Sequence, residues 1–517
     1  MTFEIVFVLL SLLGMVAALI ADKMRPGMIL FSVVVLFLCA GILTPKEMLE
    51  GFSNKGMITV ALLFLVSEGI RQSGTLGQVI KKLLPQGKTS VFKAQLRILP
   101  SVAFISAFLN NTPVVVIFAP IIKHWAKSVN LPATKFLIPL SYVTILGGIC
   151  TLIGTSTNLV VHGMILEAGF EGFSMFELGK VGIFVAIAGI IYIFLFSKRL
   201  LPDARPDTAV PDEEVEEGEK LHRVEAVLGA RFPGINKKLK DFNFQRHYGA
   251  EVKEIKTRNG QRFVTNLDDV VLHEGDTLVV MADDTFIPTW GESSVFVLLT
   301  NGNEPDTSGK KKRWFALLLL VLMIVGATVG ELPITKEMFP DIKLDMFFFV
   351  SITTIIMAWT NLFPARKYTK YISWDILITI ACAFAISKAM VNSGVADSVA
   401  KFIIGLSDDY GPHVLLAMVF IITNLFTELI TNNAAAALSF PIALEVANHL
   451  GVSPTPFFVV ICMAASASFS TPIGYQTNLI VQGIGGYKFT DFVKIGLPLN
   501  IIVFVLSVFL IPLFWNF

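Results

Sequence analysis

The sequence predicts a polytopic α-helical membrane protein with two inverted repeats, each having five transmembrane helices plus a re-entrant hairpin, and a small α+β cytosolic insert. Three observations predict this fold. The 517 residues are 54% hydrophobic and only 16% charged, with a mean hydropathy of +0.69, which is too apolar for a soluble chain of this length. Apolar runs of about 20 residues, the length that spans a bilayer, recur along the chain. Motifs of the first half return in the second.

The first half, residues 1–200, is predicted to contain five spans and one interrupted pair of helices. The apolar start of the chain resembles a signal peptide, but Glu4 stands where a basic segment would precede it, so we predict a membrane span here. The run 92–127 is broken by two central asparagines, which predicts a re-entrant hairpin of two half-length helices. The spans are predicted at 3–21, 27–43, 57–72, 137–166 with an interruption near 154–157, and 177–197.

The second half, residues 314–517, repeats this layout. Its broken pair is predicted at 413–449, again with two asparagines at the break. Its spans are predicted at 314–331, 345–363, 372–391, 457–485 with an interruption, and 493–515.

Sequence motifs of the two halves recur at a constant offset. The strongest match pairs GTSTNLVV at 154–161 with GYQTNLIV at 474–481. The offset stays at 320 or 321 residues throughout, which indicates a duplication. Further pairs are Ser53 with Ser373, Asn111 with Asn432, Pro120 with Pro441, and Phe136 with Phe457.

Basic residues near the span ends predict the orientation. They all fall on one side of the membrane if each repeat has five crossings and one hairpin. Because basic residues favour the cytoplasmic side, we predict that this side of the cell (inner) membrane faces the cytoplasm. Because five is odd, the second repeat is inverted relative to the first. Inverted repeats with paired broken helices are typical of secondary transporters whose site lies near the midplane. The residues counted are Lys23, Arg25, Lys81, Lys82, Lys88, Lys93, Arg97, Lys123, Lys127, Lys198, Arg199, 310–313, Arg366, Lys367 and Lys370.

The two breaks, at 108–113 and 430–435, mark the predicted binding site, because backbone leaves a helix inside lipid only where protein buries it or a cavity opens. Thr112 is predicted to cap a half-helix with Pro113 at its first position, and Asn433 to cap the matching one. Such helix starts suit an anion. The amide and hydroxyl oxygens beside them suit alkali cations. An alternative interpretation is ordinary polar kinks that stabilise helix packing.

Residues 203–310 form the predicted insert. It opens with an acidic linker at 212–217, and a compact core is predicted over 220–292. The core contains no P-loop and no GxGxxG motif. We therefore predict a small α+β module on the cytoplasmic face. Its strands are predicted at 224–228, 250–257 and 277–281, a helix start at 235–241 and a turn at 273–276.

Several classes of function are not indicated. No catalytic triad, paired carboxylates or nucleotide motif is visible, so we predict no enzyme, no cofactor and no ATP-driven pump. The net charge of +1 gives no reason to expect nucleic acid as a partner. The four cysteines lie far apart and predict neither a disulfide nor a zinc site. Glu428 is the best placed intramembrane carboxylate, and we favour a structural support of the break over direct ion coupling.

These motifs resemble the divalent anion:sodium symporter family. The resemblance covers both membrane halves, roughly four-fifths of the chain, and rests on the hairpin tips, on Pro441 and on the Gly-x-x-x-Asn interruptions at 154–158 and 474–478. The family has Ser-Asn-Thr at each tip. This chain has Asn-Asn-Thr at 110–112 and Thr-Asn-Asn at 431–433, so one hydroxyl is lost from each.

The resemblance implies which residues hold ions and substrate. One sodium ion would be held by Ser106, Asn110, Asn111 and Gly154, and a second by Thr427, Thr431, Asn432 and Gly474. The substrate would lie between Asn111, Thr112 and Thr155 on one side and Asn432, Asn433 and Tyr475 on the other. An elevator-type or rocking movement and a homodimer in the lipid bilayer are also implied.

The insert is similar to the C-terminal subdomain of potassium-channel regulators, the TrkA-C type, through its motifs at 234–239, 244–249 and 272–278. Symporters with such inserts are similar to the sulfate-permease branch, which favours sulfate as the substrate. A sodium- or proton-coupled dicarboxylate transporter is the first alternative, and a transporter-like anion sensor that signals through the insert is the second. Whether the insert also binds a ligand is left open by the sequence.

Overall fold

The fold is known from a computed structural model. It describes residues 3–21, 24–203, 222–229, 231–257, 261–283, 286, 290, 295–300, 310–339, 341–405, 411–472 and 474–517. The predicted acidic linker at 212–217 lies outside the described residues.

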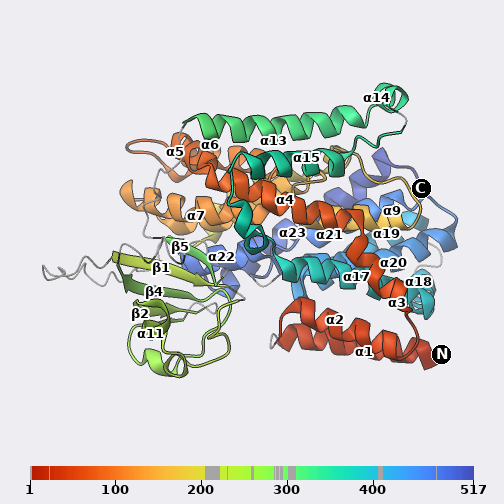
Figure 1. Ribbon diagram of the computed structural model, residues 1–517, viewed down its shortest axis with the longest axis horizontal. Helices are drawn as coiled ribbons and strands as arrows, with labels where there is room; N and C mark the ends of the chain where they lie inside the picture. Colours follow the sequence, from red (N-terminus) through yellow and green to blue (C-terminus); the bar gives the residue numbers. More distant parts are fainter. Residues whose placement is uncertain are drawn as a thin grey trace, which may run out of the picture.

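Helices make up most of both membrane halves, as predicted (Figure 1). The first half contains α1 (Phe3–Ala21), α2 (Pro26–Cys39), α3 (Pro45–Glu50), α4 (Lys55–Gln72), α5 (Thr75–Leu83), α6 (Val91–Ser106), α7 (Asn111–Ser128), α8 (Leu137–Gly148), α9 (Ser156–Glu167) and α10 (Gly179–Leu200). The second half contains α13 (Lys310–Gly330), α14 (Pro333–Met338), α15 (Met346–Trp359), α16 (Tyr368–Tyr371), α17 (Trp374–Asn392), α18 (Val395–Gly405), α19 (Gly411–Leu429), α20 (Asn432–Leu450), α21 (Thr455–Ser466), α22 (Gln476–Gly485) and α23 (Phe489–Phe514).

Helix breaks occur where the sequence places its polar and glycine-rich motifs. The run 92–127 divides into α6 and α7, and 413–449 into α19 and α20. The run 137–166 divides into α8 and α9, and 457–485 into α21 and α22. Gly154 allows one of these breaks, since a Cβ there would lie only 2.5 Å from the carbonyl oxygen of Gly148.

The insert contains one five-stranded antiparallel sheet with the order β3-β2-β4-β1-β5. Its own apolar core includes Phe232, Phe244 and Leu278. The helix expected at 235–241 is wrong: only a 3-10 turn forms at Leu239–Asp241, because Asn236 adopts a positive φ of 61° that ends regular helix. The remaining elements are β1 (His222–Leu228), α11 (Phe244–Tyr248), β2 (Glu251–Lys256), β3 (Arg262–Phe263), β4 (Thr277–Ala282) and β5 (Phe296–Thr300).

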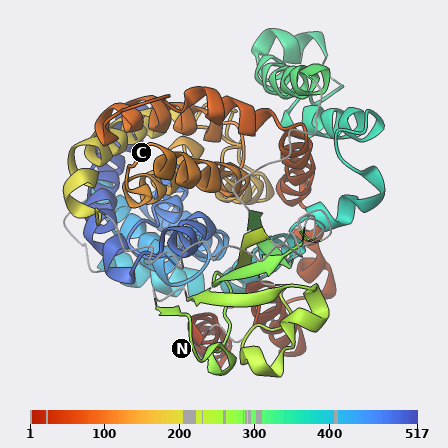
Figure 2. The same cartoon turned by 90° about the vertical axis from the view of Figure 1, so that its left-hand side faces the viewer.

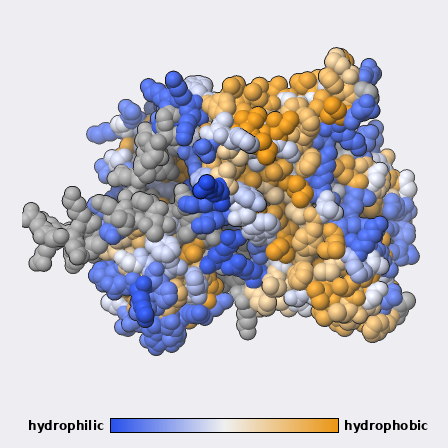
Figure 3. Space-filling model, viewed as in Figure 1, coloured by the Kyte–Doolittle hydropathy of each residue, from blue (hydrophilic) through white to orange (hydrophobic). Residues whose placement is uncertain are grey.

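Membrane character follows from the outer surface of the helical part. Seven helices in the described residues are long and apolar enough to cross a membrane. Figure 3 shows hydrophobic side chains across the middle of the helical part and hydrophilic ones at both ends of this view, including the end that carries the sheet. The prediction of a polytopic helical membrane protein with a small sheet-containing insert is therefore confirmed. The inverted arrangement, the membrane sidedness and the dimer stay predictions.

Candidate functional site

Four helices begin around one point in the interior. They are α7, α9, α20 and α22, which come from four separate segments of the chain. Side chains at their first turns contact one another: Thr155 Oγ1 lies 3.0 Å from the Tyr475 hydroxyl, and Ser156 Oγ lies 3.3 Å from Asn433 Oδ1. Because helix starts present free N–H groups and the positive ends of helix dipoles, this arrangement suits an anion.

The helix starts differ in detail from the prediction. Asn110 and not Thr112 stands at the N-cap position of α7, without a side-chain capping bond, and α20 is capped by Thr431 and not by Asn433. The Thr431 side chain accepts a hydrogen bond from the N–H of Ala434 at 3.4 Å. Both helices therefore start earlier in the chain than expected. The physical reason is that Thr112 and Asn433 use their side chains to contact the opposite half of the site.

The amide of Asn111 lies among three oxygen atoms. Its terminal nitrogen, in the orientation that satisfies its neighbours, lies 3.0 Å from the Thr144 carbonyl, 3.2 Å from the Gly154 carbonyl and 2.8 Å from Ser106 Oγ. Its oxygen then accepts from the Tyr475 hydroxyl at 2.5 Å. If the amide turns, four oxygens face one another, and such a group suits a hard cation.

The second half builds a matching oxygen group around Asn432. The Thr427 hydroxyl lies 2.9 Å from Asn432 Oδ1 and 2.6 Å from the carbonyl oxygen of Ala465. One hydroxyl proton can satisfy only one of these two acceptors. Ala465 stands 321 residues after Thr144, so both carbonyls come from equivalent positions of α8 and α21. Gly474 lies against the same group, since a Cβ there would come within 2.6 Å of the Thr427 carbonyl oxygen.

Two asparagines stabilise the loops that precede α9 and α22. The Asn158 amide donates to the Thr151 carbonyl at 2.9 Å, and the Asn478 amide donates to the Thr471 carbonyl at 3.1 Å. In each loop the threonine hydroxyl accepts from the N–H of the site glycine, at 3.1 Å for Gly154 and at 3.2 Å for its counterpart. These bonds hold both glycine carbonyls in place.

Two contacts cross between the halves at equivalent positions. The Thr112 hydroxyl lies 3.3 Å from Gln476 Oε1, and the Asn433 oxygen accepts from Ser156 and Thr157, both at 3.3 Å. Each contact thus joins the start of α7 or α20 to the start of a helix in the other half of the chain, α22 or α9.

Tyr475 occupies the centre of this arrangement. Its side chain is 8% exposed, and its hydroxyl contacts Asn111 and Thr155 and also interacts with Asn432. The equivalent residue in the first half is Thr155, so one small and one large side chain meet where the halves join.

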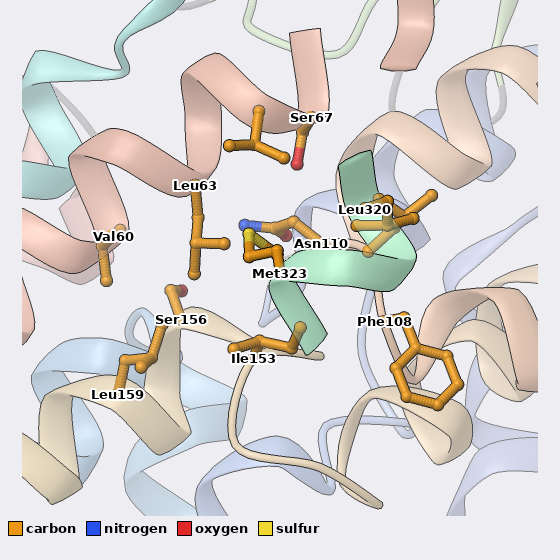
Figure 4. A pocket seen from close by; sticks show the side chains of 12 residues that line it. Val60, Leu63, Ser67, Phe108, Asn110, Ile153, Ser156, Leu159, Leu320 and Met323 are labelled. Atoms are coloured by element: carbon orange, nitrogen blue, oxygen red, sulfur yellow. The ribbon is translucent and has the colours of Figure 1, made fainter. Parts of the chain in front are cut away.

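Asn110 takes a different place from the other predicted site residues. Figure 4 shows its side chain beside Leu63 and Met323, in a pocket that Ser67 and Ser156 also line. This pocket lies between α4, α13 and the tip of the first hairpin. Of the residues expected for the first cation, Asn110 is thus the one that lines this mainly apolar pocket, which borders the site at Ser156.

Glu428 supports the second break. Its carboxylate accepts from the Ser470 N–H at 2.9 Å and from the Asn500 amide at 2.7 Å. These bonds hold the loop between α21 and α22, in agreement with the interpretation that we favoured from sequence.

Sequence reasoning missed five contributors to this arrangement. The Thr144 and Ala465 carbonyls are backbone groups within helices, which no side-chain motif marks, although the repeat offset relates them. The side chains of Ser156, Thr157 and Gln476 follow the predicted residues directly, and the matched segments at 154–161 and 474–481 contain all three.

Comparisons with known proteins agree that this chain is similar to membrane transporters. A model of the family described as citrate transporter, CitMHS, matches residues 16–451 and, in a second match, 342–517. An uncharacterized transporter of Synechocystis sp. is 30% identical and covers 94% of this chain and 93% of its own length. Sodium/sulfate cotransporter 2 of Chlamydomonas reinhardtii is 22% identical over 95% of this chain and 87% of its own.

A solved structure shares the fold. The YdaH transporter of Alcanivorax borkumensis matches with a TM-score of 0.52 and 12% sequence identity, over 90% of this chain and 87% of that one. The predicted relation to anion transporters is confirmed at the level of the family, whereas the narrower branch and the TrkA-C type of the insert stay predictions. The chain belongs to the citrate transporter family, and it is a multi-pass membrane transporter and not an enzyme.

Proposed function

We propose that this protein is a sodium-coupled secondary transporter that imports a small divalent oxyanion, and sulfate is the substrate that we favour. The observation that carries the proposal is the pair of matched oxygen groups around Asn111 and Asn432, beside four converging helix starts. Cations at the two oxygen groups would offset the charge of a dianion between them. Ions and substrate would then cross together at a lower desolvation cost than a bare dianion.

The first sodium ion would bind Ser106, the Asn111 oxygen, the Gly154 carbonyl and, beyond the sequence prediction, the Thr144 carbonyl. Asn110 would contribute its backbone only, because its side chain lines the pocket beside Leu63. The second sodium ion would bind Thr427, Thr431, Asn432, Gly474 and the Ala465 carbonyl. Hydroxyl, amide and carbonyl oxygens are ligands that hard cations prefer.

The substrate would lie between Asn111, Thr112 and Thr155 and, across from them, Asn432, Asn433 and Tyr475. Tyr475 is buried and bonds to Asn111, so its ring would limit the length of a substrate between the two tips, which favours a compact tetrahedral anion over an extended dicarboxylate. Relatives described as sodium/sulfate cotransporters support the same choice. The family description as citrate transporter keeps a sodium- or proton-coupled dicarboxylate transporter as the second candidate.

The paired contacts of the two halves support inverted repeats and alternating access by an elevator-type movement. The hairpins with α8, α9, α21 and α22 would move against a scaffold that includes α2 and α15, which would also form a homodimer in a cell (inner) membrane. The insert would be cytoplasmic. Transport would need no cofactor other than the coupling ion.

Uptake of labelled sulfate into proteoliposomes, with and without an inward sodium gradient and with succinate as competitor, tests the proposal. Sodium-dependent uptake that succinate leaves intact is expected. Uptake that succinate blocks, or that a proton gradient drives without sodium, would favour the dicarboxylate or proton-coupled transporter. No uptake of any anion, with an anion-dependent change in the insert, would favour a sensor.

A further inference from the structure

A second pocket lies between the end of α5 and the end of α7, at the end of the helical part that also carries the sheet (Figure 1). Its volume of about 490 Å³ is within the range of pockets that hold a small ligand. Lys81, Lys88 and Ser128 are among the residues that line it. The Trp125 indole N–H donates to the Pro85 carbonyl at 2.8 Å, and this bond ties α7 to the loop after α5.

The insert occupies a neighbouring part of this end. Figure 2, which faces the end, shows the sheet below the red-orange and orange helices of the first half. The insert docks on α7, where the Lys123 ammonium lies 2.9 Å from both carboxylate oxygens of Glu225. It also docks on α22, where a Cβ on Gly483 would lie 2.7 Å from Thr277 Oγ1. Among the described residues, none of the insert lines the second pocket.

Positive charges surround the second pocket. Lys81 and Lys88 line it, and Lys82 and Lys127 are the chain neighbours of lining residues. The Arg97 guanidinium lies beside them, since it donates to the Lys82 carbonyl at 3.0 Å. None of these five side chains forms an ion pair within the part of the chain that the structure describes. The pocket therefore has a local excess of positive charge.

The sequence explains this excess. The range 69–166, which contains α5, α6 and α7, has no Asp or Glu. Two lysines of this range do have carboxylate partners from later segments: Lys123 pairs with Glu225, and the Lys135 ammonium lies 3.0 Å from Asp203. Neither of these carboxylates belongs to a residue that lines the pocket. The charge of the pocket cations is thus available to a ligand from outside the chain.

Two helix ends at the pocket reduce this charge only in part. The C-termini of α5 and α7 each carry about half a negative charge, so five cations leave an excess of about four positive charges. The last carbonyls of α7 also accept hydrogen bonds from the N–H groups of residues 129–131. In contrast, the N–H groups of Gly87 and Lys88 make no hydrogen bond to a described residue. They can donate to the oxygen atoms of an anion.

An exposed apolar surface begins beside the pocket. α6 starts shortly after Lys88, and its Phe92 and Leu96 are both exposed at the four-residue spacing that places side chains on one face. Phe92 packs edge-on against Phe194 of α10, with ring centroids 6.0 Å apart. Ile191, one turn before, is also exposed. A continuous apolar surface of this kind in a membrane protein is covered by lipid chains.

We propose that the second pocket binds the headgroup of an anionic phospholipid, whose acyl chains lie along α6 and α10. Lys81 and Lys88 would contact the phosphate, since clusters of basic side chains at the edge of a lipid-covered surface attract anionic headgroups. Free phosphate has the same charged group but no chains for the apolar surface of α6. The pocket is separate from the site between the two tips, so this inference does not depend on what the protein transports.

Native mass spectrometry of the full chain in detergent, titrated with phosphatidylglycerol or phosphatidylcholine, tests the inference. Phosphatidylglycerol is expected to bind the wild-type protein about 25-fold more tightly than phosphatidylcholine. Lys81→Gln/Lys88→Gln should weaken its binding about 25-fold, which is about five-fold for each lysine. Lys81→Arg/Lys88→Arg keeps both charges and should bind the lipid as the wild type does.

Two further variants separate the pocket from a general attraction to basic residues. Arg366→Gln/Lys370→Gln is the matched control, because it removes two exposed basic residues that do not line the pocket, and binding should stay unchanged. Ser128→Phe fills the pocket without a change of charge, so it should weaken binding by a factor similar to that of the lysine variant. Equal affinity for the two lipids, equal losses in the control and the lysine variant, or unchanged binding in Ser128→Phe would overturn the inference.

Glycerol 3-phosphate and inorganic phosphate distinguish a lipid from a soluble ligand. Both have the phosphate group, and neither has acyl chains. Each is therefore expected to leave phosphatidylglycerol bound when added at the concentration at which the lipid saturates the protein. Displacement of the lipid by either compound at that concentration would assign the pocket to a soluble phosphate and overturn the lipid site.

Discussion

The two halves of the site build similar oxygen groups around an asparagine, but they differ in the residues at which the halves meet. Asn111 and Asn432 each lie beside a hydroxyl residue and a helix carbonyl at equivalent positions. In contrast, Tyr475 stands where the first half has Thr155, and Glu428 stands where the first half has Ala107.

This difference has a steric cause. Thr155 and Tyr475 come from equivalent positions and meet directly, with their hydroxyls 3.0 Å apart. Two tyrosines would compete for the same space, and two threonines would leave it open. One small and one large residue fill it. Parts of the site remote from the join can therefore be alike in the two halves, whereas the residues at the join have to differ.

The largest expected effect is the loss of either central asparagine. Asn111→Ala and Asn432→Ala should each lower sodium-dependent uptake about 100-fold or more, since each removes the amide at the centre of an oxygen group. Initial uptake rates at saturating sodium measure this. Asn392→Ala, which removes hydrogen bonds to Ile42 and Glu47 far from the site, is the control. Normal uptake in either variant would show that the halves are not equivalent.

Tyr475 tests the asymmetry itself. Tyr475→Phe keeps the ring but leaves Asn111 and Thr155 without their common partner, so the KM for sulfate should rise about ten-fold. Tyr475→Thr makes the second half like the first and enlarges the space, so succinate should begin to compete. Competition assays with both variants measure this. Succinate competition with the wild-type protein but not with Tyr475→Thr would reverse the role assigned to the ring.

The hydroxyls beside the asparagines should have a smaller and equal effect. Ser106→Ala and Thr427→Ala each remove one oxygen ligand, while the carbonyls of Thr144 and Ala465 remain. The sodium concentration at half-maximal uptake should therefore rise about five-fold in both, in the range of a single typical net hydrogen bond. A change in only one variant would mean that only one half binds sodium.

Glu428→Gln should change transport least. The amide nitrogen that this substitution introduces would face donors from which the carboxylate now accepts, so the free energy of unfolding should fall by about 2 kcal/mol. Uptake by the folded protein should keep its sodium dependence. Thermal unfolding in detergent and uptake are measured together, with Glu445→Gln as the control. Loss of a pH-dependent component of uptake in Glu428→Gln would instead assign proton coupling to this carboxylate.

The span pattern was predictable because membrane helices follow from hydropathy and length. The broken runs at 92–127 and 413–449 became pairs of helices, each with two consecutive polar asparagines where its second helix begins. The caps at Thr112 and Asn433 were wrong, because a side chain that can cap a helix can also bond across the site, and only the neighbours decide between them.

The order of the residues was enough to predict which segments are apolar and long enough to cross a membrane, where these segments break, and that motifs recur at a constant offset in the two halves. These depend on local composition and on a constant offset along the chain. The packing of the helices alone places the Thr144 carbonyl against Asn111 and the Ala465 carbonyl against the Thr427 hydroxyl, directs the Asn110 side chain into an apolar pocket, and brings the insert against α7 and α22. Backbone oxygens are the same in every residue, and long-range contacts depend on how helices pack, so neither leaves a mark in the order of the residues.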